Sequence, residues 1–304
     1  MSGIETTGSV PKGLWPGVKS SFEAAGKKTA NYHEMLFKKV SSDKKYEEYV
    51  QVVGHGIAQL KPEASPVQFA SIRQGYTTRL VNATYALGTT VTFEEMKFNK
   101  FMKPAFTRTE RLRNSLHQAK QIIAANIFDR SANATYTGGD GVTLLNTAHP
   151  MAAGGTWANR PTVDSALNEA ALQDLLIQIR TNRADNGDIN PLNGHQLVVA
   201  ENNFFVGNQL VKNAKQPETF SNNENLIVTL GMLPGGCVAN PYLQTANAWY
   251  VTTNIDDGMI YQEAIGADIW EDNDSKTRDY QIMAAETYTL GWANPRGVFG
   301  NFLI

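Results

Sequence analysis

The longest uninterrupted helical pattern in the chain is FTRTERLRNSLHQAKQIIAANIFDR, which runs from Phe106 to Arg130. Its apolar residues recur at steps of three and four and predict one buried helix face: Leu112, Leu116, Ala119, Ile123 and Ile127. The polar residues between them predict an exposed opposite face: Arg111, Arg113, Asn114, Gln118, Lys120 and Gln121. Thr107 followed by Glu110 predicts a capping box at the start. A helix of roughly 35 Å suits the spine of a domain better than a small catalytic motif.

The composition is that of a soluble globular protein. The chain is 42% hydrophobic and 18% charged, and its 304 residues suffice for one elaborate domain or two. The single cysteine, Cys237, excludes a disulfide framework and a cysteine-based metal cluster within one chain. The N-terminal sequence lacks the basic and apolar regions of a secretory signal, and no run approaches about 18 apolar residues. We therefore expect a soluble cytoplasmic product without a membrane partner.

Charge is divided unevenly along the chain. Residues 1–130 contain 19 basic and 11 acidic residues, whereas residues 131–304 contain 8 and 18, so the two parts carry net charges of +8 and −10. This division fits nucleic-acid contact by the basic part and equally fits contact between copies of one chain. It also fits two solvated surfaces of opposite sign.

The N-terminal third changes its pattern twice. Residues 1–20 are rich in Gly, Ser, Thr and Pro and predict an extended arm with Trp15 as its one apolar anchor. Residues 21–49 mix lysines with apolar positions and predict an amphipathic helix. Residues 67–98 are rich in Thr, Tyr and Val and predict a long β-hairpin or ribbon. Because this ribbon is too polar to form its own core, we expect it to pack on a second subunit.

The region after the spine helix predicts a compact α/β subdomain. A loop rich in Gly and Asn precedes an amphipathic helix over 164–183, with Asp164 as the expected N-cap. The patterns that follow predict a buried strand at 195–200, a helix over 203–213 and a strand at 226–230. The last third predicts antiparallel strands at 248–253, 259–263, 267–270 and 280–290. We expect the spine helix to lie under the strand at 280–290.

The sequence offers little catalytic chemistry. Its five histidines are scattered without the spacing of a metal site. His149 precedes Pro150 in a Gly-rich loop and could act as a general base, but no Ser or Cys nucleophile signature accompanies it. The oxygen-bearing residues at 185–190 fit a turn better than a Ca²⁺ loop. We therefore predict a protein that is not an enzyme and has no catalytic, cofactor-binding or metal-binding residue.

The order of the elements resembles that of the major capsid proteins of tailed bacteriophages, which have the Hong Kong 97-like fold. Three segments carry the resemblance: GVTLLNTAHP (141–150), the helix end AANIFDR (124–130) and the strand segment ADIWEDND (267–274). They are similar to the Mu-like head-subunit branch, in which a loop of the form DG…L…HP follows a long helix. The resemblance covers nearly the whole chain. It implies an α+β fold with a long spine helix, an extended β-ribbon loop, a peripheral domain and an axial domain.

The resemblance also implies how the chain is divided. An N-terminal arm (1–63) would reach across neighbours, and an extended loop (64–97) would lie over an adjacent subunit. A peripheral domain would combine residues 98–159 and 248–304 around the spine helix. Residues 160–247 would form an axial domain that points to the five-fold and six-fold axes.

The function implied is self-assembly into the pentamers and hexamers of an icosahedral shell around double-stranded DNA. The implied partners are other copies of the chain, weakly contacted packaged DNA, and scaffolding, portal and decoration proteins. Assembly would take place in the host cytoplasm and the product would be the virion capsid. The expected contacts between subunits are Trp15, Lys38, Lys39, Arg73, Arg79, Tyr85, Arg111 and Arg113.

Two alternatives remain beside this function. The first is a nucleic-acid-binding protein that uses the basic N-terminal region, through Lys27, Lys28, Lys38 and Lys39, and whose DNA binding would be sensitive to salt. The second is a hydrolase with a loop centred on His149.

Overall fold

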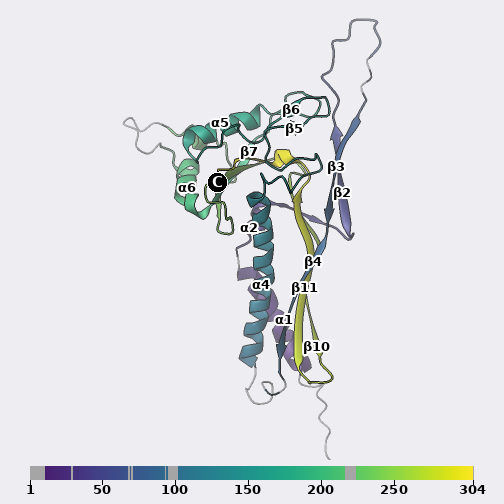
Figure 1. Cartoon of the computed structure of the whole chain (residues 1–304), viewed down its shortest axis with the longest axis vertical. Helices are drawn as coiled ribbons and strands as arrows, with labels where there is room; N and C mark the ends of the chain where they lie inside the picture. Colours follow the sequence, from purple (N-terminus) through teal and green to yellow (C-terminus); the bar gives the residue numbers. More distant parts are fainter. Residues whose placement is uncertain are drawn as a thin grey trace, which may run out of the picture.

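The computed structural model describes residues 11–28, 30–67, 69, 71–92, 94, 102–215 and 224–303. Figure 1 shows an elongated part, in which α4 lies alongside long strands, and a compact part that contains α5 and α6. The helices are α1 (Pro11–Lys28), α2 (Tyr32–Leu36), α4 (Met102–Asp129), α5 (Glu169–Arg180), α6 (Phe204–Lys212) and α7 (Leu226–Thr229). The strands are β1 (Lys38–Ser41), β2 (Tyr46–Val53), β3 (Arg73–Val81), β4 (Ala83–Val91), β5 (His149–Pro150), β6 (Thr156–Trp157), β7 (Gly194–Ala200), β8 (Cys237–Asn240), β9 (Trp249–Thr253), β10 (Met259–Asn273), β11 (Tyr280–Trp292) and β12 (Val298–Asn301).

The described strands form two four-stranded sheets and two small pairs. The elongated sheet has the order β1-β10-β11-β4, and the compact sheet has the order β12-β9-β7-β8. β2 pairs with β3 in a two-stranded ribbon, and β5 pairs with β6 in a short hairpin. Helices and largely antiparallel strands therefore occur in separate groups, which confirms the predicted α+β class.

Helix α4 is the predicted spine and packs on β11, as expected. Leu112 and Leu116 are buried in one hydrophobic cluster with Ile282 and Ala284 of β11. The predicted start is wrong, because α4 begins more than one turn earlier and Thr107 lies inside it. Thr107 is therefore not an N-cap, and the expected capping box does not form.

The polar face of α4 is partly buried, which corrects a second prediction. Lys120 is only 7% exposed, Gln121 is fully buried, and Arg113 points towards the buried Glu286. The expectation that these residues face solvent is wrong, because they contact partners far away in the sequence: Glu286 for Lys120 and Arg113, and His33 for Gln121. Arg111 is exposed, as predicted.

Residues 11–28 form a helix, so the predicted extended arm over 1–20 is wrong from Pro11 onward. Residues 1–10 lie outside the described residues. Val18 and Phe22 of α1 are buried in the same cluster as Leu112 of α4. Ser21 Oγ also donates to the Glu110 carboxylate at 3.2 Å. The apolar spacing of α1 therefore attaches it to α4 of its own chain.

The predicted hairpin over 67–98 contains β3 and β4, but these strands have different partners. β3 pairs with β2, whereas β4 pairs with β11 in the elongated sheet. The projecting ribbon consists of residues 46–53 and 73–81 and their connection, and not of residues 64–97. The lysine-rich pattern over 21–49 predicted a helix, and this prediction is wrong at its end. Residues 46–53 form a strand whose side chains alternate in burial.

The compact part confirms the strand β7 and the helix α6 and corrects the neighbouring elements. The N-cap of α5 is Asn168, whose side chain accepts from the Ala171 amide, whereas Asp164 accepts from the Phe302 amide. Residues 226–229 form α7 rather than a strand. β9 and β12 join β7 in the compact sheet, so this sheet extends past the predicted domain boundary at 247.

Candidate functional site

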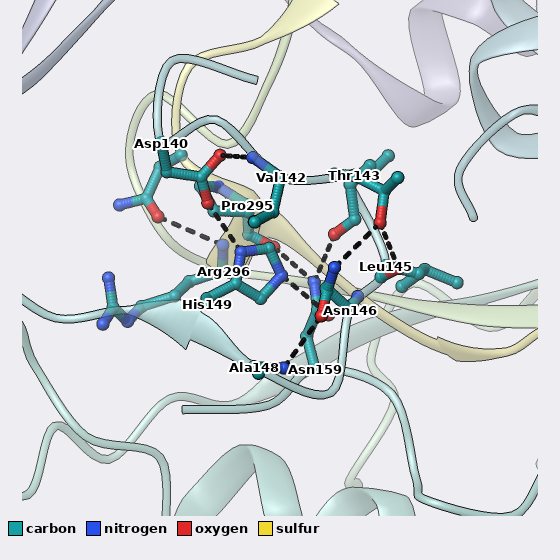
Figure 2. Close-up of polar contacts among 12 residues, drawn as sticks. Asp140, Val142, Thr143, Leu145, Asn146, Ala148, His149, Asn159, Pro295 and Arg296 are labelled. Carbon is teal, nitrogen blue, oxygen red and sulfur yellow. Dashed lines mark hydrogen bonds and ion pairs between the residues drawn. The ribbon is translucent and has the colours of Figure 1, made fainter. Parts of the chain in front are cut away.

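Asn159 is the centre of a buried polar junction between the loop that follows α4 and the C-terminal tail (Figure 2). Its Nδ2 donates to the carbonyl oxygens of Leu144, Pro295 and Val298 at 2.6, 3.1 and 3.0 Å. Its Oδ1 accepts from the Asn146 amide at 2.8 Å. Because the three carbonyls fix the orientation of the amide, Oδ1 is available only as an acceptor.

His149 lies between Asp140 and Asn159 in this junction (Figure 2). Its Nδ1 is 2.6 Å from an Asp140 carboxylate oxygen, and its Nε2 is 3.1 Å from Asn159 Oδ1. Since Oδ1 is an acceptor, the Nε2 that faces it is placed to donate a hydrogen bond. The imidazole also stacks on Trp157, with 4.4 Å between ring centroids. Both polar side chains of this buried pair therefore have a partner, which lowers the cost of burying them.

Arg296 and Asp185 form a buried ion pair beside the junction. The two terminal guanidinium nitrogens contact the carboxylate at 3.2 and 3.1 Å, and Nε donates to the Arg183 carbonyl at 3.0 Å. The guanidinium also lies 4.2 Å from the ring centroid of Trp157. Gln51 of β2 donates to Asp185 as well. The ion pair thereby connects the base of the ribbon to the C-terminal tail.

The junction is a structural element and not an active site. The His149 ring is fully buried and both of its nitrogens have partners, so it is not placed to take a proton from a substrate. The alternative of a hydrolase centred on His149 is therefore wrong. Within the described ranges, no group of three or more His, Cys, Asp or Glu side chains could hold a metal ion. None of the described helices is both long and apolar enough to cross a membrane.

Replacing Asn159 by aspartate should destabilise the fold by at least about 3 kcal/mol, because a carboxylate would face three carbonyl oxygens that have lost their donor. Urea unfolding of the unassembled chain measures this effect. The matched control is Asn133→Asp, since exposed Asn133 uses only its Oδ1, as acceptor for the Thr135 amide. Equal midpoints for the two variants would contradict the assignment of Asn159 as the centre of the junction.

A second buried polar cluster lies between α4 and the elongated sheet. Glu286 of β11 is buried, and its carboxylate lies 2.8 Å from Lys120 Nζ and 3.7 Å from Arg113. Lys120 also donates to the Tyr261 hydroxyl at 3.0 Å. Burial, and then the charge of Glu286, raises the pKa of Tyr288. One anion and two cations are therefore held among aromatic rings.

His33 connects α2 to this region of α4. Its backbone amide donates to Gln121 Oε1 at 3.1 Å, and its ring Nδ1 lies 2.8 Å from Gln121 Nε2. Nδ1 is therefore an acceptor, as in a neutral imidazole. Burial, and next the charge of Lys120, lowers the pKa of His33 to about 3. Burial also lowers the pKa of His117 beside it.

Acidification should therefore destabilise the fold. Between the ordinary histidine value of 6.5 and about 3, the unfolded chain binds a proton at His33 that the folded chain does not. Stability should fall by up to about 1.4 kcal/mol for each pH unit in this window. The free energy of unfolding as a function of pH measures the slope. His33→Gln, which cannot be protonated, should be less stable at pH 7 and have a shallower slope; an unchanged slope would contradict the prediction.

Several of the predicted charged contacts have partners within the chain. Lys38 Nζ lies 3.2 Å from Asp256, and Lys39 forms an ion pair with Glu263. Arg79 contacts Glu48 at 2.6 Å. Part of the attraction between the basic and acidic parts of the chain is thus intramolecular. The nucleic-acid alternative is weakened for Lys38 and Lys39 for this reason, while the side chains of Lys27 and Lys28 lie outside the described residues.

The remaining predicted contacts have different surroundings. Arg73 and Arg111 are exposed. Tyr85 stacks on Tyr288, with 4.7 Å between ring centroids. Arg113 points inward to Glu286, so its expected outward orientation is wrong. Trp15 belongs to α1, and its side chain lies outside what the structure describes.

The sequence patterns did not predict that the end of the ribbon exposes apolar side chains. Leu60 and Phe69 are 94% and 97% exposed, and further exposed apolar residues flank them in the connection between β2 and β3: Ile57, Val67 and Ile72. Apolar residues scattered through a stretch rich in Gly, Pro and polar residues were the signal that could have found it.

Comparisons with solved structures define the fold. The virus-like particle protein from Pyrococcus furiosus is 11% identical with a TM-score of 0.56, and the match covers 93% of this chain and 97% of that chain. The capsid of the empty GTA particle is 10% identical with a TM-score of 0.57 and 91% coverage of both chains. The capsid protein of Cyanophage P-SCSP1u is 10% identical, with a TM-score of 0.55 and coverage of 90% and 88%. A search of curated proteins by sequence gave no match.

A spine helix beside a long sheet, a projecting ribbon and a compact α/β part are the features of the Hong Kong 97-like fold. Residues 75–301 match the model of the phage capsid protein family. The chain belongs to this family. Its members are structural proteins, so the chain is a capsid protein and not an enzyme.

Proposed function

We propose that the chain assembles with itself into the pentamers and hexamers of an icosahedral phage shell that encloses double-stranded DNA. The observation that carries this proposal is the exposed apolar end of the ribbon, where Leu60 and Phe69 have almost no contact with their own chain. Apolar side chains gathered on an exposed projection mark a surface for another protein. In a shell, a neighbouring copy covers this end.

In this proposal each observed part of the chain has a role in the shell. The ribbon of β2 and β3 is the loop that lies over an adjacent subunit, in place of residues 64–97. The elongated part around α4 is the peripheral domain, and the compact part is the axial domain that points to the five-fold and six-fold axes. In this proposal β9 and β12 belong to the axial domain, because they pair with β7. The N-terminal arm over residues 1–63 is proposed to reach across neighbours, although its α1 packs on α4 of the same chain.

Most of the proposed subunit contacts that the structure describes have exposed side chains. Arg73 at the ribbon and Arg111 on α4 are exposed, and Lys38 and Arg79 keep exposed side chains despite their internal partners. Lys39, Tyr85 and Trp15 complete the proposed set. Packaged DNA is contacted weakly, and scaffolding, portal and decoration proteins are the proposed further partners. The Mu-like branch remains the proposed subfamily, with assembly in the host cytoplasm.

Assembly tests this proposal directly. The purified protein should form hexamers, pentamers or closed shells that are visible by negative-stain microscopy and light scattering. A Leu60→Ser/Phe69→Ser double variant should leave the monomer folded but lower the yield of shells at least about tenfold, because each lost apolar contact weakens association by on the order of 1 kcal/mol or more.

The matched control is Val163→Ser, which removes an exposed apolar side chain outside the ribbon and should assemble normally. Monomers alone under all assembly conditions, including those with a scaffolding protein, would overturn the proposed function. Normal shells from the double ribbon variant would instead remove only the role assigned to the ribbon end.

A further inference from the structure

Strand β4 forms one edge of the elongated sheet without the usual protection of an edge strand. Within the described residues β11 is its only strand partner. Its sequence, ATYALGTTV, contains neither a charged residue nor a proline. Its nine-residue register with β11 runs from Ala83 to Val91 without a shift, so it contains no bulge. Charges, prolines and bulges are the features that natural proteins use to keep such an edge from pairing with another chain.

The opposite side of the same sheet provides a contrast. β1 covers β10 only from Ile260 to Glu263, so the rest of β10 is also an edge. That edge is protected, because it carries Asp268, Glu271 and Asp272 and has two register shifts between Glu263 and Asp268. Of the two edges of the elongated sheet, the β4 edge is therefore the one that lacks features that prevent pairing with another chain.

Helix α4 lies beside β4. Its Arg108 donates to the Thr90 carbonyl, near one end of the strand, at 3.2 Å. Ile122 is 44% exposed and Leu87 of β4 is 46% exposed. Exposed apolar side chains therefore lie on the edge strand and on the helix beside it.

The sheet face opposite α4 has a shallow groove along the same strand. Its volume is 440 Å³, and it is lined by residues 86–90 of β4 together with Trp270, Gln281 and Met283. Met283 pairs with Gly88 on one side and with Trp270 on the other, so these positions share one face. Ile282 and Ala284 point the other way, into the core. An added strand at this edge would meet an uncharged groove on this face, whereas Arg108 lies near one end of the strand on the α4 side.

We propose that β4 pairs antiparallel with β4 of a second copy across a two-fold axis, which joins two elongated sheets into one. This inference rests on the proposed function, because shell assembly supplies the second copy. In such an isologous contact every residue faces its own symmetry-related segment. A charged residue near the axis would face the same charge, which destabilises a strand pair. β4 has no charge along its whole length and so meets this requirement.

Single cysteines test the symmetry of the contact. In a background that carries Cys237→Ala, each position from 83 to 90 is changed to cysteine in turn, and assembled shells are treated with a mild oxidant. A two-fold axis places one residue directly opposite its own copy, so disulfide-linked dimers should reach a sharp maximum at one position. Val163→Cys, away from β4, is the control and should give few dimers. Shells in which no β4 position gives dimers, or in which all do so equally, would overturn the inference.

A charge on the edge gives a second test. Ala86→Lys should lower the yield of shells about tenfold, the equivalent of about 1.4 kcal/mol, while Ala86→Ser should assemble normally. The melting temperature of unassembled Ala86→Lys should match that of the unsubstituted chain. Normal shells from Ala86→Lys would contradict the inference and leave the proposed function intact. Failure of the unsubstituted chain to form shells would instead contradict the proposed function.

Discussion

Changing Glu286 to glutamine should destabilise the folded chain by about 3 to 5 kcal/mol. The substitution keeps the shape of the side chain but removes the negative charge that contacts Lys120 and Arg113 in the buried cluster. The Lys120 ammonium would remain buried among Tyr261 and Tyr288 without a counter-charge. Urea unfolding of the unassembled chain measures the loss.

The control is Glu48→Gln, which removes the partner of exposed Arg79. Exposed ion pairs contribute about 0 to 1 kcal/mol, so this variant should unfold almost as the unsubstituted chain does. A double variant, Lys120→Met/Glu286→Leu, should recover much of the stability lost by Glu286→Gln, because it leaves no buried charge of the pair unmatched. Similar losses for Glu286→Gln and Glu48→Gln would show that the cluster is not an ion pair that supports the fold.

Changing Leu116 to aspartate should prevent folding. Leu116 is buried between α1 and β11, in the cluster that contains Phe22 and Ile282. The loss of a buried leucine side chain costs about 2 to 5 kcal/mol, and burial of an unpaired carboxylate adds a further penalty. The sum is comparable with the whole stability of a typical domain, about 5 to 15 kcal/mol.

The adjacent exposed residue provides the control for this change. Ser115→Asp places the same carboxylate one position away on the solvent side of α4, and its stability should change by no more than about 0.5 kcal/mol. Circular dichroism and size-exclusion chromatography of the two variants distinguish the outcomes. A soluble, helical Leu116→Asp protein with an unchanged melting temperature would contradict the assignment of α4 as the spine of the core.

Local patterns predicted the elements whose burial follows a regular period. The three- and four-residue spacing of α4, the β-branched run of β7 and the alternation of β11 each indicated the observed element. Leu226–Thr229 shows where this fails. Its apolar run predicted a strand, but the Asn225 side chain accepts a hydrogen bond from the Ile227 amide and caps a helical turn. The Asn225 cap therefore outweighed the strand preference of these apolar residues.

Such local patterns could not predict contacts between residues that are distant in the sequence. Lys120 resembled a surface residue because its charge is matched by Glu286, which is far away in the chain. β3 and β4 resembled a hairpin because they follow each other, yet each pairs with a strand from another part of the chain. The order of the elements along the chain was enough to predict the class of capsid proteins. The contact surfaces could not be predicted in this way, because in the proposed assembly the groups that cover Phe69 or β4 belong to other copies.

The placement of β12 has a consequence for how the protein is made. β12 pairs with β9, and the carbonyls of Pro295 and Val298 receive hydrogen bonds from buried Asn159. Neither the compact sheet nor the junction is complete until residues 295–301 have left the ribosome. During synthesis on the ribosome, at about 5 to 20 residues per second, completion of the fold therefore waits for residues 295–301. A nascent chain that still lacks them has an incomplete compact sheet and cannot enter a shell in its folded form.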